Sequence, residues 1–174
     1  MLGEGATSDV FTSLNQKTGQ DSRVRILAQD GKISSQITPF KALDTPVKLT
    51  ISRYPLTKHM QETRFKTTAR DFYDGERARL SALTQADEVI FLNENEQVCE
   101  GSFTSLFIQK GGKFLTPALS CGLLAGVLRQ EMVEAGDAVE ALLKLDDIVS
   151  AEKIFIGNSL RGLMPAKFID FLRH

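Results

Sequence analysis

The chain has 174 residues and carries 21 Lys and Arg against 22 Asp and Glu, which gives a net charge of −1 at neutral pH. Non-specific binding to nucleic acid or to an anionic membrane needs an excess of basic residues that neutralises phosphates, and this chain has none. A composition of 42% hydrophobic and 25% charged residues is typical of a globular protein with a buried core. We therefore expect neither a nucleic acid nor a membrane as partner.

Cysteine and histidine are scarce. Cys99 and Cys121 are too few for a disulfide framework and favour a reducing compartment. His59 and His174 show no metal-ligand spacing to them, so we expect no metal site. The first residues have neither a basic start nor an apolar run, and no stretch reaches the roughly 18 apolar residues of a spanning helix. These observations predict a cytoplasmic protein.

Residues 1–58 are polar and irregular, and two runs in them predict strands. Val24 to Ala28 ends at the turn pair Asp30-Gly31, and Val47 to Ile51 is apolar at alternate positions.

From about residue 64 the signals become denser. Residues 67–86 predict a helix, because Phe72, Leu80 and Leu83 fall on roughly one helical face. Four short apolar runs follow and are separated by turns, which predicts an antiparallel meander. The runs are residues 89–92, 98–99, 106–108 and 114–115.

The best helical pattern runs from Leu124 to Ala135, with Gly136 placed to end the helix in a left-handed conformation. Strands and helices then alternate irregularly, which predicts the α+β class with mainly antiparallel strands and flanking helices. The remaining predicted elements are a strand at 139–143, a short helix at 146–151, a strand at 153–156 and a last apolar segment after Pro165.

Two side chains could take part in covalent or acid–base chemistry. Lys66 stands just before the first helix, and burial beside Arg64 and Arg70 would make its amine nucleophilic. Glu100 ends an apolar strand, where an inward-facing pleat would bury it. The ordinary alternative for each is a charge in water.

Two glycine-bearing segments could bind an anion. Residues 122–129 lead into the strongest helix, whose first amides lack internal acceptors. Residues 157–162 form a small polar turn after a buried strand and offer amides and a hydroxyl. Each could instead be a simple loop or change of direction. Together with a lysine and a carboxylate, they are the parts that hold a phosphorylated aldehyde cofactor as a lysine imine.

The motifs occur in an order that resembles the class IV aminotransferase family, the pyridoxal-phosphate enzymes of fold type IV. They are Lys-Thr-Thr-x-Arg, Asp-Glu-Val-Ile-Phe-Leu-Asn, Val-Cys-Glu-Gly-Ser, Thr-Pro-x-Leu, Gly-Leu-Leu-x-Gly-Val-Leu-Arg and Gly-Asn-Ser-Leu-Arg-Gly-Leu-x-Pro-Ala. The first and last wordings look most like the 4-amino-4-deoxychorismate lyase branch. The resemblance spans residues 64–170. It implies a remnant of a small N-terminal domain at 1–58 and a pyridoxal-phosphate-binding catalytic domain at 59–174.

The resemblance also implies how the cofactor is held. Lys66 would form the imine and carry the proton, and Glu100 would pair with the pyridine nitrogen. Leu124 would pack on the ring, while the amides of Val127 and Leu128 would hold the phosphate.

The turn after the buried strand would serve both phosphate and substrate. Ser159 would add its hydroxyl to the phosphate site, and the amides of Ser159 and Leu160 would face the substrate carboxylate. As a separate hypothesis, the guanidinium of Arg161 would bind a carboxylate of a chorismate-like substrate.

Three features depart from the family pattern. Phe65 stands where the lyase branch usually has His, and Ser105 stands where the family usually has Asn. The arginine that the family's small domain gives to the phosphate has no identifiable counterpart in residues 1–58.

The leading interpretation is a homodimeric lyase that converts 4-amino-4-deoxychorismate to 4-aminobenzoate and pyruvate, with a synthase subunit as a further partner. The first alternative is a branched-chain or D-amino-acid aminotransferase. Proton loss to Lys66 is common to both; β-elimination then gives the lyase and reprotonation on the cofactor gives the aminotransferase. The second alternative is a non-catalytic homologue that acts as a dimerisation module.

Overall fold

The computed structural model describes residues 21–57 and 66–169, and the chain divides into two compact units, residues 1–42 and 43–174. The strand expected at 47–51 belongs to the second unit, so the units meet earlier than the domain boundary expected after residue 58. The domain remnant at residues 1–58 and the catalytic domain at 59–174 stay predictions.

In the first unit, β1 (Ser22–Gln29) and β2 (Lys32–Pro39) form an antiparallel hairpin. Asp30 and Gly31 join them with φ of 50° and 71°, the conformation that two-residue hairpin turns require. The first strand and its turn are confirmed. The second strand was not predicted, because its run Lys-Ile-Ser-Ser-Gln-Ile-Thr-Pro is mostly polar.

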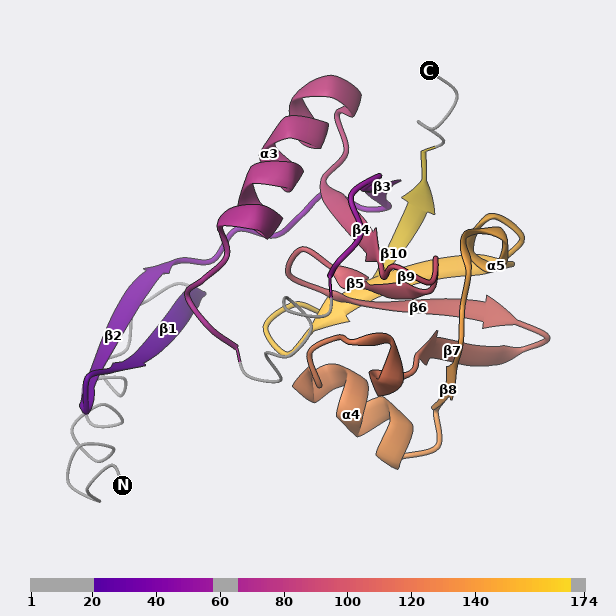
Figure 1. Cartoon of the computed structure of the whole chain (residues 1–174). Coiled ribbons are helices and arrows are strands. Elements are labelled where there is room, and N and C mark those ends of the chain that lie inside the picture. The colour runs from indigo at the N-terminus through magenta and orange to yellow at the C-terminus, as the bar shows by residue number, and fades with distance from the viewer. Residues whose placement is uncertain (1–20, 58–65, 170–174) are drawn as a thin grey trace. The chain divides into compact units, whose positions relative to one another are not determined.

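The second unit is built on one eight-stranded sheet, in the order β5-β4-β3-β10-β9-β6-β7-β8 (Figure 1). Four neighbouring pairs of this described sheet are antiparallel and three are parallel. With flanking helices, this confirms the α+β class. The strands are β3 (Val47–Ile51), β4 (Glu88–Leu92), β5 (Val98–Gly101), β6 (Ser105–Lys110), β7 (Lys113–Pro117), β8 (Ala138–Ala141), β9 (Lys153–Asn158) and β10 (Gly162–Phe168).

The predicted meander is wrong. β4 pairs with β5 and β6 pairs with β7, but β3, β10 and β9 lie between the two hairpins. The short turns gave the local pairings correctly. The two hairpins are separated because β3 pairs in parallel with β4 and β10, which are distant in the sequence. This pairing buries the apolar strands, and the local sequence pattern does not reveal it.

The sheet curls until its two ends meet. At the start of β5, the Val98 amide donates a hydrogen bond of 2.8 Å to the carbonyl of Leu143, which lies just beyond β8 at the opposite end of the sheet. This bond joins the two ends of the curled sheet on one side of a core. The enclosed cluster consists of Val47, Leu49, Ile51, Ile90, Val98, Leu106, Ile108, Leu143, Ile148, Ile156 and Met164.

Three α-helices flank the sheet in the described part of this unit: α3 (Asp71–Thr84), α4 (Val127–Glu134) and α5 (Leu145–Val149). α3 packs beside β4, where Leu80 joins a second apolar cluster that includes Phe91, and α4 packs beside β8 and β9 (Figure 1). Gly136 follows α4 with φ of 79°, which confirms the predicted end of the helix. No helix among the described residues is long and apolar enough to cross a membrane.

Candidate active site

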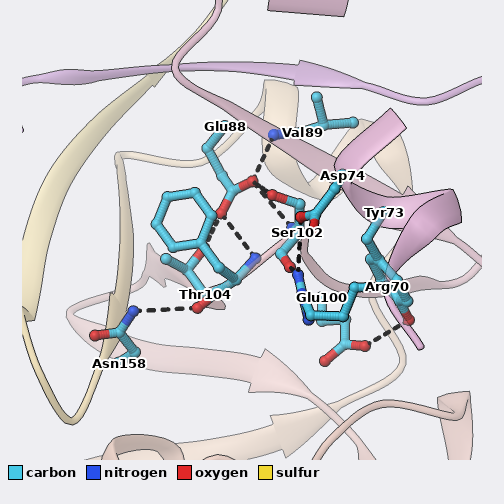
Figure 2. A network of polar contacts seen from close by, with 10 residues as sticks. Arg70, Tyr73, Asp74, Glu88, Val89, Glu100, Ser102, Thr104 and Asn158 are labelled. Carbon is cyan, nitrogen blue, oxygen red and sulfur yellow. Dashed lines mark hydrogen bonds and ion pairs between the residues drawn. The ribbon is translucent and has the colours of Figure 1, made fainter. Parts of the chain in front are cut away.

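Glu100, the predicted partner of the pyridine nitrogen, lies near the end of β5 and is half-buried. The Tyr73 hydroxyl donates to its Oε1 over 2.9 Å, as Figure 2 shows, and the Leu124 amide donates to its Oε2 over 3.1 Å. Burial raises the pKa of Glu100, and these two hydrogen bonds and Arg70 oppose that rise. Each carboxylate oxygen can accept a second hydrogen bond, so the group is oriented and still able to bind another donor.

Tyr73 is a site residue that the sequence analysis missed. Its ring packs edge-on against Phe91 at 5.0 Å and against Phe72 at 6.0 Å between ring centroids. Burial, followed by the charge of Glu100, raises the pKa of the Tyr73 phenol, which therefore stays protonated and acts as a donor. The only sequence signal was an aromatic pair in the first turn of the helix.

Glu88, at the start of β4, is a second carboxylate that was missed. It has 0% exposure and accepts five hydrogen bonds. Burial raises its pKa and those hydrogen bonds oppose the rise. The donors are the amides of Val89, Ser102 and Phe103 and the hydroxyls of Ser102 and Thr104 (Figure 2).

The turn between β5 and β6 is therefore fixed around Glu88. A Cβ on Gly101 would lie 2.4 Å from Thr104 Oγ1 and 2.9 Å from Glu88 Oε2, so only glycine fits there. The Arg70 guanidinium donates to the Ser102 carbonyl from the other side. The turn is held in place because the amides of Ser102 and Phe103, the hydroxyls of Ser102 and Thr104 and the carbonyls of Ser102, Phe103 and Thr104 form hydrogen bonds within the chain.

Asn158 connects this turn to the predicted substrate turn. Its Nδ2 donates to the Phe103 carbonyl over 3.1 Å (Figure 2), and its Oδ1 accepts from the amides of Leu160 at 3.1 Å and Arg161 at 3.0 Å. Ser159 is exposed in the same turn. The Leu160 amide is thus engaged within its own turn, and its contact with a substrate carboxylate stays a prediction.

α4 starts at an uncapped end. Its N-cap, Gly126, has an extended backbone and no side-chain hydrogen bond. The amides of Val127 and Leu128 are in the first turn and have no intrahelical acceptor. Leu124, whose own amide binds Glu100, stands just before them. One short segment therefore joins the predicted ring site to the predicted phosphate site.

Arg129, in the same turn of α4, is 2% exposed and holds the helix to the sheet. Its guanidinium donates to the Pro117 carbonyl over 2.7 Å and 3.2 Å and pairs with the Glu140 carboxylate. The motif that contains it was noted, but this anchoring role was not foreseen.

Lys66 lies five residues before the start of α3 and is exposed. The burial that would make its amine nucleophilic is therefore not observed. Arg64 and Phe65 lie outside the described residues. The pairing of Lys66 with a cofactor stays a prediction.

A sequence profile described as Amino-transferase class IV matches residues 9–169. Because the match covers most of the chain, the protein belongs to the class IV aminotransferase family. This confirms the family expected from the motifs.

A solved structure from Mesorhizobium loti, assigned as an amino-acid aminotransferase, is 36% identical with a TM-score of 0.87 and covers 97% of this chain and 83% of that one. The aminodeoxychorismate lyase of Bacillus subtilis is 32% identical over 88 residues, 48% of this chain and 30% of the relative. A protein of Thermotoga maritima assigned as a branched-chain-amino-acid aminotransferase is 32% identical over 88 residues, 48% of this chain and 32% of the relative. The chain thus spans about a third of these last two relatives.

Pyridoxal phosphate is the cofactor of this family, and the described residues fit it. Glu100 retains acceptor capacity for a protonated ring nitrogen, and the start of α4 offers uncapped amides to a phosphate. At that start, a Cβ on Gly126 would lie 3.0 Å from Ser105 Oγ, so glycine keeps space open beside a hydroxyl.

Proposed function

We propose that this protein is a pyridoxal-phosphate enzyme of the lyase or aminotransferase type, with 4-amino-4-deoxychorismate lyase as the leading activity. One observation carries the proposal: Glu100 is oriented by Tyr73 and by the Leu124 amide, and the uncapped α4 begins three residues beyond Leu124. A carboxylate and an anion site so linked match the two ends of one cofactor.

When bound, the cofactor supplies an electron sink for the bond that breaks at the substrate carbon carrying the amino group. Glu100 would hold the proton on the ring nitrogen, which keeps the ring electron-poor. Val127, Leu128 and Ser159 would bind the phosphate, and Leu124 would restrict the ring's tilt.

Lys66 would move the proton. Its amine would accept a proton from the substrate carbon that bears the amino group. In the lyase, the bond to the enolpyruvyl oxygen then breaks, the ring becomes aromatic, and the enolpyruvate takes up a proton. The products, 4-aminobenzoate and pyruvate, together contain all the atoms of the substrate.

Arg161 supports the lyase over other reactions, as a hypothesis. It is half-buried, and its amide is fixed by Asn158. Chorismate-like substrates carry two carboxylates, and a guanidinium binds a carboxylate with two parallel hydrogen bonds. Arg161→Ala would then raise KM for the lyase substrate much more than it lowers kcat, whereas an unchanged KM would refute this role.

Amino-acid transamination is the second candidate, favoured by the likeness to the aminotransferase structure from Mesorhizobium loti. Purified protein with pyridoxal phosphate is offered 4-amino-4-deoxychorismate in one assay, and branched-chain or D-amino acids with 2-oxoglutarate in another. Formation of 4-aminobenzoate identifies the lyase and formation of glutamate identifies the aminotransferase. If neither product forms although a cofactor band is present, the remaining candidate is the non-catalytic dimerisation module.

We further propose a homodimer in the cytoplasm. Cys99 and Cys121 are both free and buried, which fits a reducing compartment. Light scattering of the purified protein measures the assembly, and the mass of a single chain at micromolar concentration would contradict the dimer.

A further inference from the structure

Ser105 is a buried serine whose hydroxyl has no partner among the described residues. It begins β6 and is 9% exposed, and its neighbours in the turn, Ser102 and Thr104, both give their hydroxyls to Glu88. The Ser105 hydroxyl forms no hydrogen bond within residues 21–57 and 66–169. Unlike Thr50 Oγ1 and Arg77 Nε, the fully enclosed unpartnered atoms of the described residues, the Ser105 Oγ keeps some accessible surface, so an acceptor from outside the chain can reach it.

The hydroxyl points at the start of α4. A Cβ built on Gly126, the N-cap, would lie 3.0 Å from Ser105 Oγ. Gly126 directly precedes the first-turn amides of Val127 and Leu128, which also lack acceptors. Three unsatisfied donors of different origin therefore converge beside one glycine.

Ser105 is also adjacent to the substrate turn. Its Cα partner across the sheet is Gly157 in β9. A Cβ on Gly157 would lie 2.5 Å from both the Gly162 carbonyl and Leu128 Cδ2, so the end of β9 is packed directly against the first turn of α4. The start of α4 and the turn beginning at Gly157 are therefore adjacent. Ser105 is next to both of them.

We propose that the Ser105 hydroxyl is a direct phosphate ligand, which joins these two segments into a single anion site. The inference rests on the proposed function in taking the phosphate to be that of pyridoxal phosphate. The hydroxyl donates to a phosphate oxygen, and the amides of Val127 and Leu128 donate to the others. A charge-assisted hydrogen bond of this kind is stronger than one to a neutral acceptor.

Ser105→Ala tests the proposal with three probes: pyridoxal phosphate, inorganic phosphate and pyridoxal, which lacks the phosphate. Calorimetry measures each dissociation constant. We expect about tenfold weaker binding of both phosphate-containing probes, equivalent to about 1.4 kcal/mol, with pyridoxal unchanged. Ser105→Thr, which keeps a hydroxyl, should restore at least part of the loss.

Ser150→Ala is the matched control, because it removes a serine hydroxyl from the C-cap of α5. Its three dissociation constants should match the wild type. A Ser105→Ala variant that binds both phosphate probes within twofold of the wild type would overturn the proposal. So would equal losses for pyridoxal and pyridoxal phosphate, because that result indicates a structural role only.

The two proposals fail separately. Ser105-dependent binding of inorganic phosphate without a Lys66-dependent cofactor band would uphold the anion site and refute the enzyme. A Lys66-dependent band that Ser105→Ala leaves at wild-type affinity would uphold the enzyme and refute the ligand. No binding of either phosphate probe to the wild type would refute both.

Discussion

Glu88 and Glu100 are two carboxylates on neighbouring strands, and they differ in what surrounds them. Glu88 in β4 accepts five hydrogen bonds and has no exposed surface. Glu100 in β5 accepts two hydrogen bonds. It lies two residues before Ser102, whose amide and hydroxyl donate to Glu88. The first is saturated by its own chain, and the second keeps room for another donor. Glu88 therefore has a structural role in the site, whereas Glu100 can still bind a ligand.

The largest expected effect is the loss of the saturated carboxylate. Glu88→Ala removes the acceptor of five hydrogen bonds, and among their donors the Ser102 amide keeps the Val89 carbonyl as a second acceptor. We expect the free energy of unfolding to fall by about 3–5 kcal/mol. Urea denaturation measures it. Glu94→Ala, at an exposed turn, is the control and should stay within about 0.5 kcal/mol of the wild type. Equal stability of the two variants would show that the hydrogen bonds of Glu88 do not stabilise the fold.

Glu76 is a third carboxylate, and its partners are one arginine and one hydroxyl instead of amides. Hydrogen bonds from Arg79, and then from Ser52, hold its pKa below the ordinary 4.5. A lowered folded pKa stabilises the fold above the unfolded pKa, and that stability is lost as the pH falls through the folded value. Glu76→Gln should therefore cost about 1–3 kcal/mol at pH 7 and progressively less in acid. A cost that does not change with pH would contradict this charge pairing.

Gly126→Ala tests the space at the open end of the site. Its φ of −67° suits alanine, but the added Cβ would lie 3.0 Å from Ser105 Oγ. We expect about tenfold weaker binding of pyridoxal phosphate, equivalent to about 1.4 kcal/mol, with little change in stability. Gly75→Ala is the control: nothing lies within 4 Å of its Cβ, and it should stabilise α3 by about 0.5–1 kcal/mol without changing cofactor binding. Unchanged binding in Gly126→Ala would show that the cofactor does not use this space.

The smallest effect concerns the orientation of Glu100. Tyr73→Phe removes one of its two donors and keeps the packing against Phe91. We expect a loss of about 1 kcal/mol in unfolding free energy and a change in the pH dependence of the bound cofactor's absorbance. Glu100 is the group nearest the ring nitrogen in this account, so an unaltered pH dependence would contradict that placement.

Sequence reasoning proposed residues to bind the ligand, and these stay predictions, but it missed the residues that hold them in place. Glu100, the start of α4 and the turn at Ser159 belong to continuous motifs, and each motif carries a local signal. Glu88, Tyr73 and Asn158 act through hydrogen bonds to residues 14 to 55 positions away in the sequence. No periodicity or spacing reveals such contacts, because they depend on how the sheet is ordered.

The same reason explains the outcome for the fold. Single elements, such as β3, α3 and the end of α4 at Gly136, were predicted because their signals are local. The order of the sheet was not, because β3 and β10 enter between two hairpins that adjoin in sequence. The motif that contains Glu88 contributed to the family resemblance, but the five hydrogen-bond donors of Glu88 are visible only in the structure.

The central claim is that Lys66 and Glu100 bind the two reactive ends of one cofactor, and the absorbance of the purified protein with pyridoxal phosphate tests it most directly. The account predicts a visible band of the lysine-bound cofactor that is lost in Lys66→Ala and retained in Lys113→Ala, a change at another exposed lysine. Titration of the wild type and both variants with the cofactor, followed by borohydride reduction and peptide mapping, locates the modified lysine. A label on Lys66 alone supports the account, whereas no band, or a band that persists in Lys66→Ala, contradicts it.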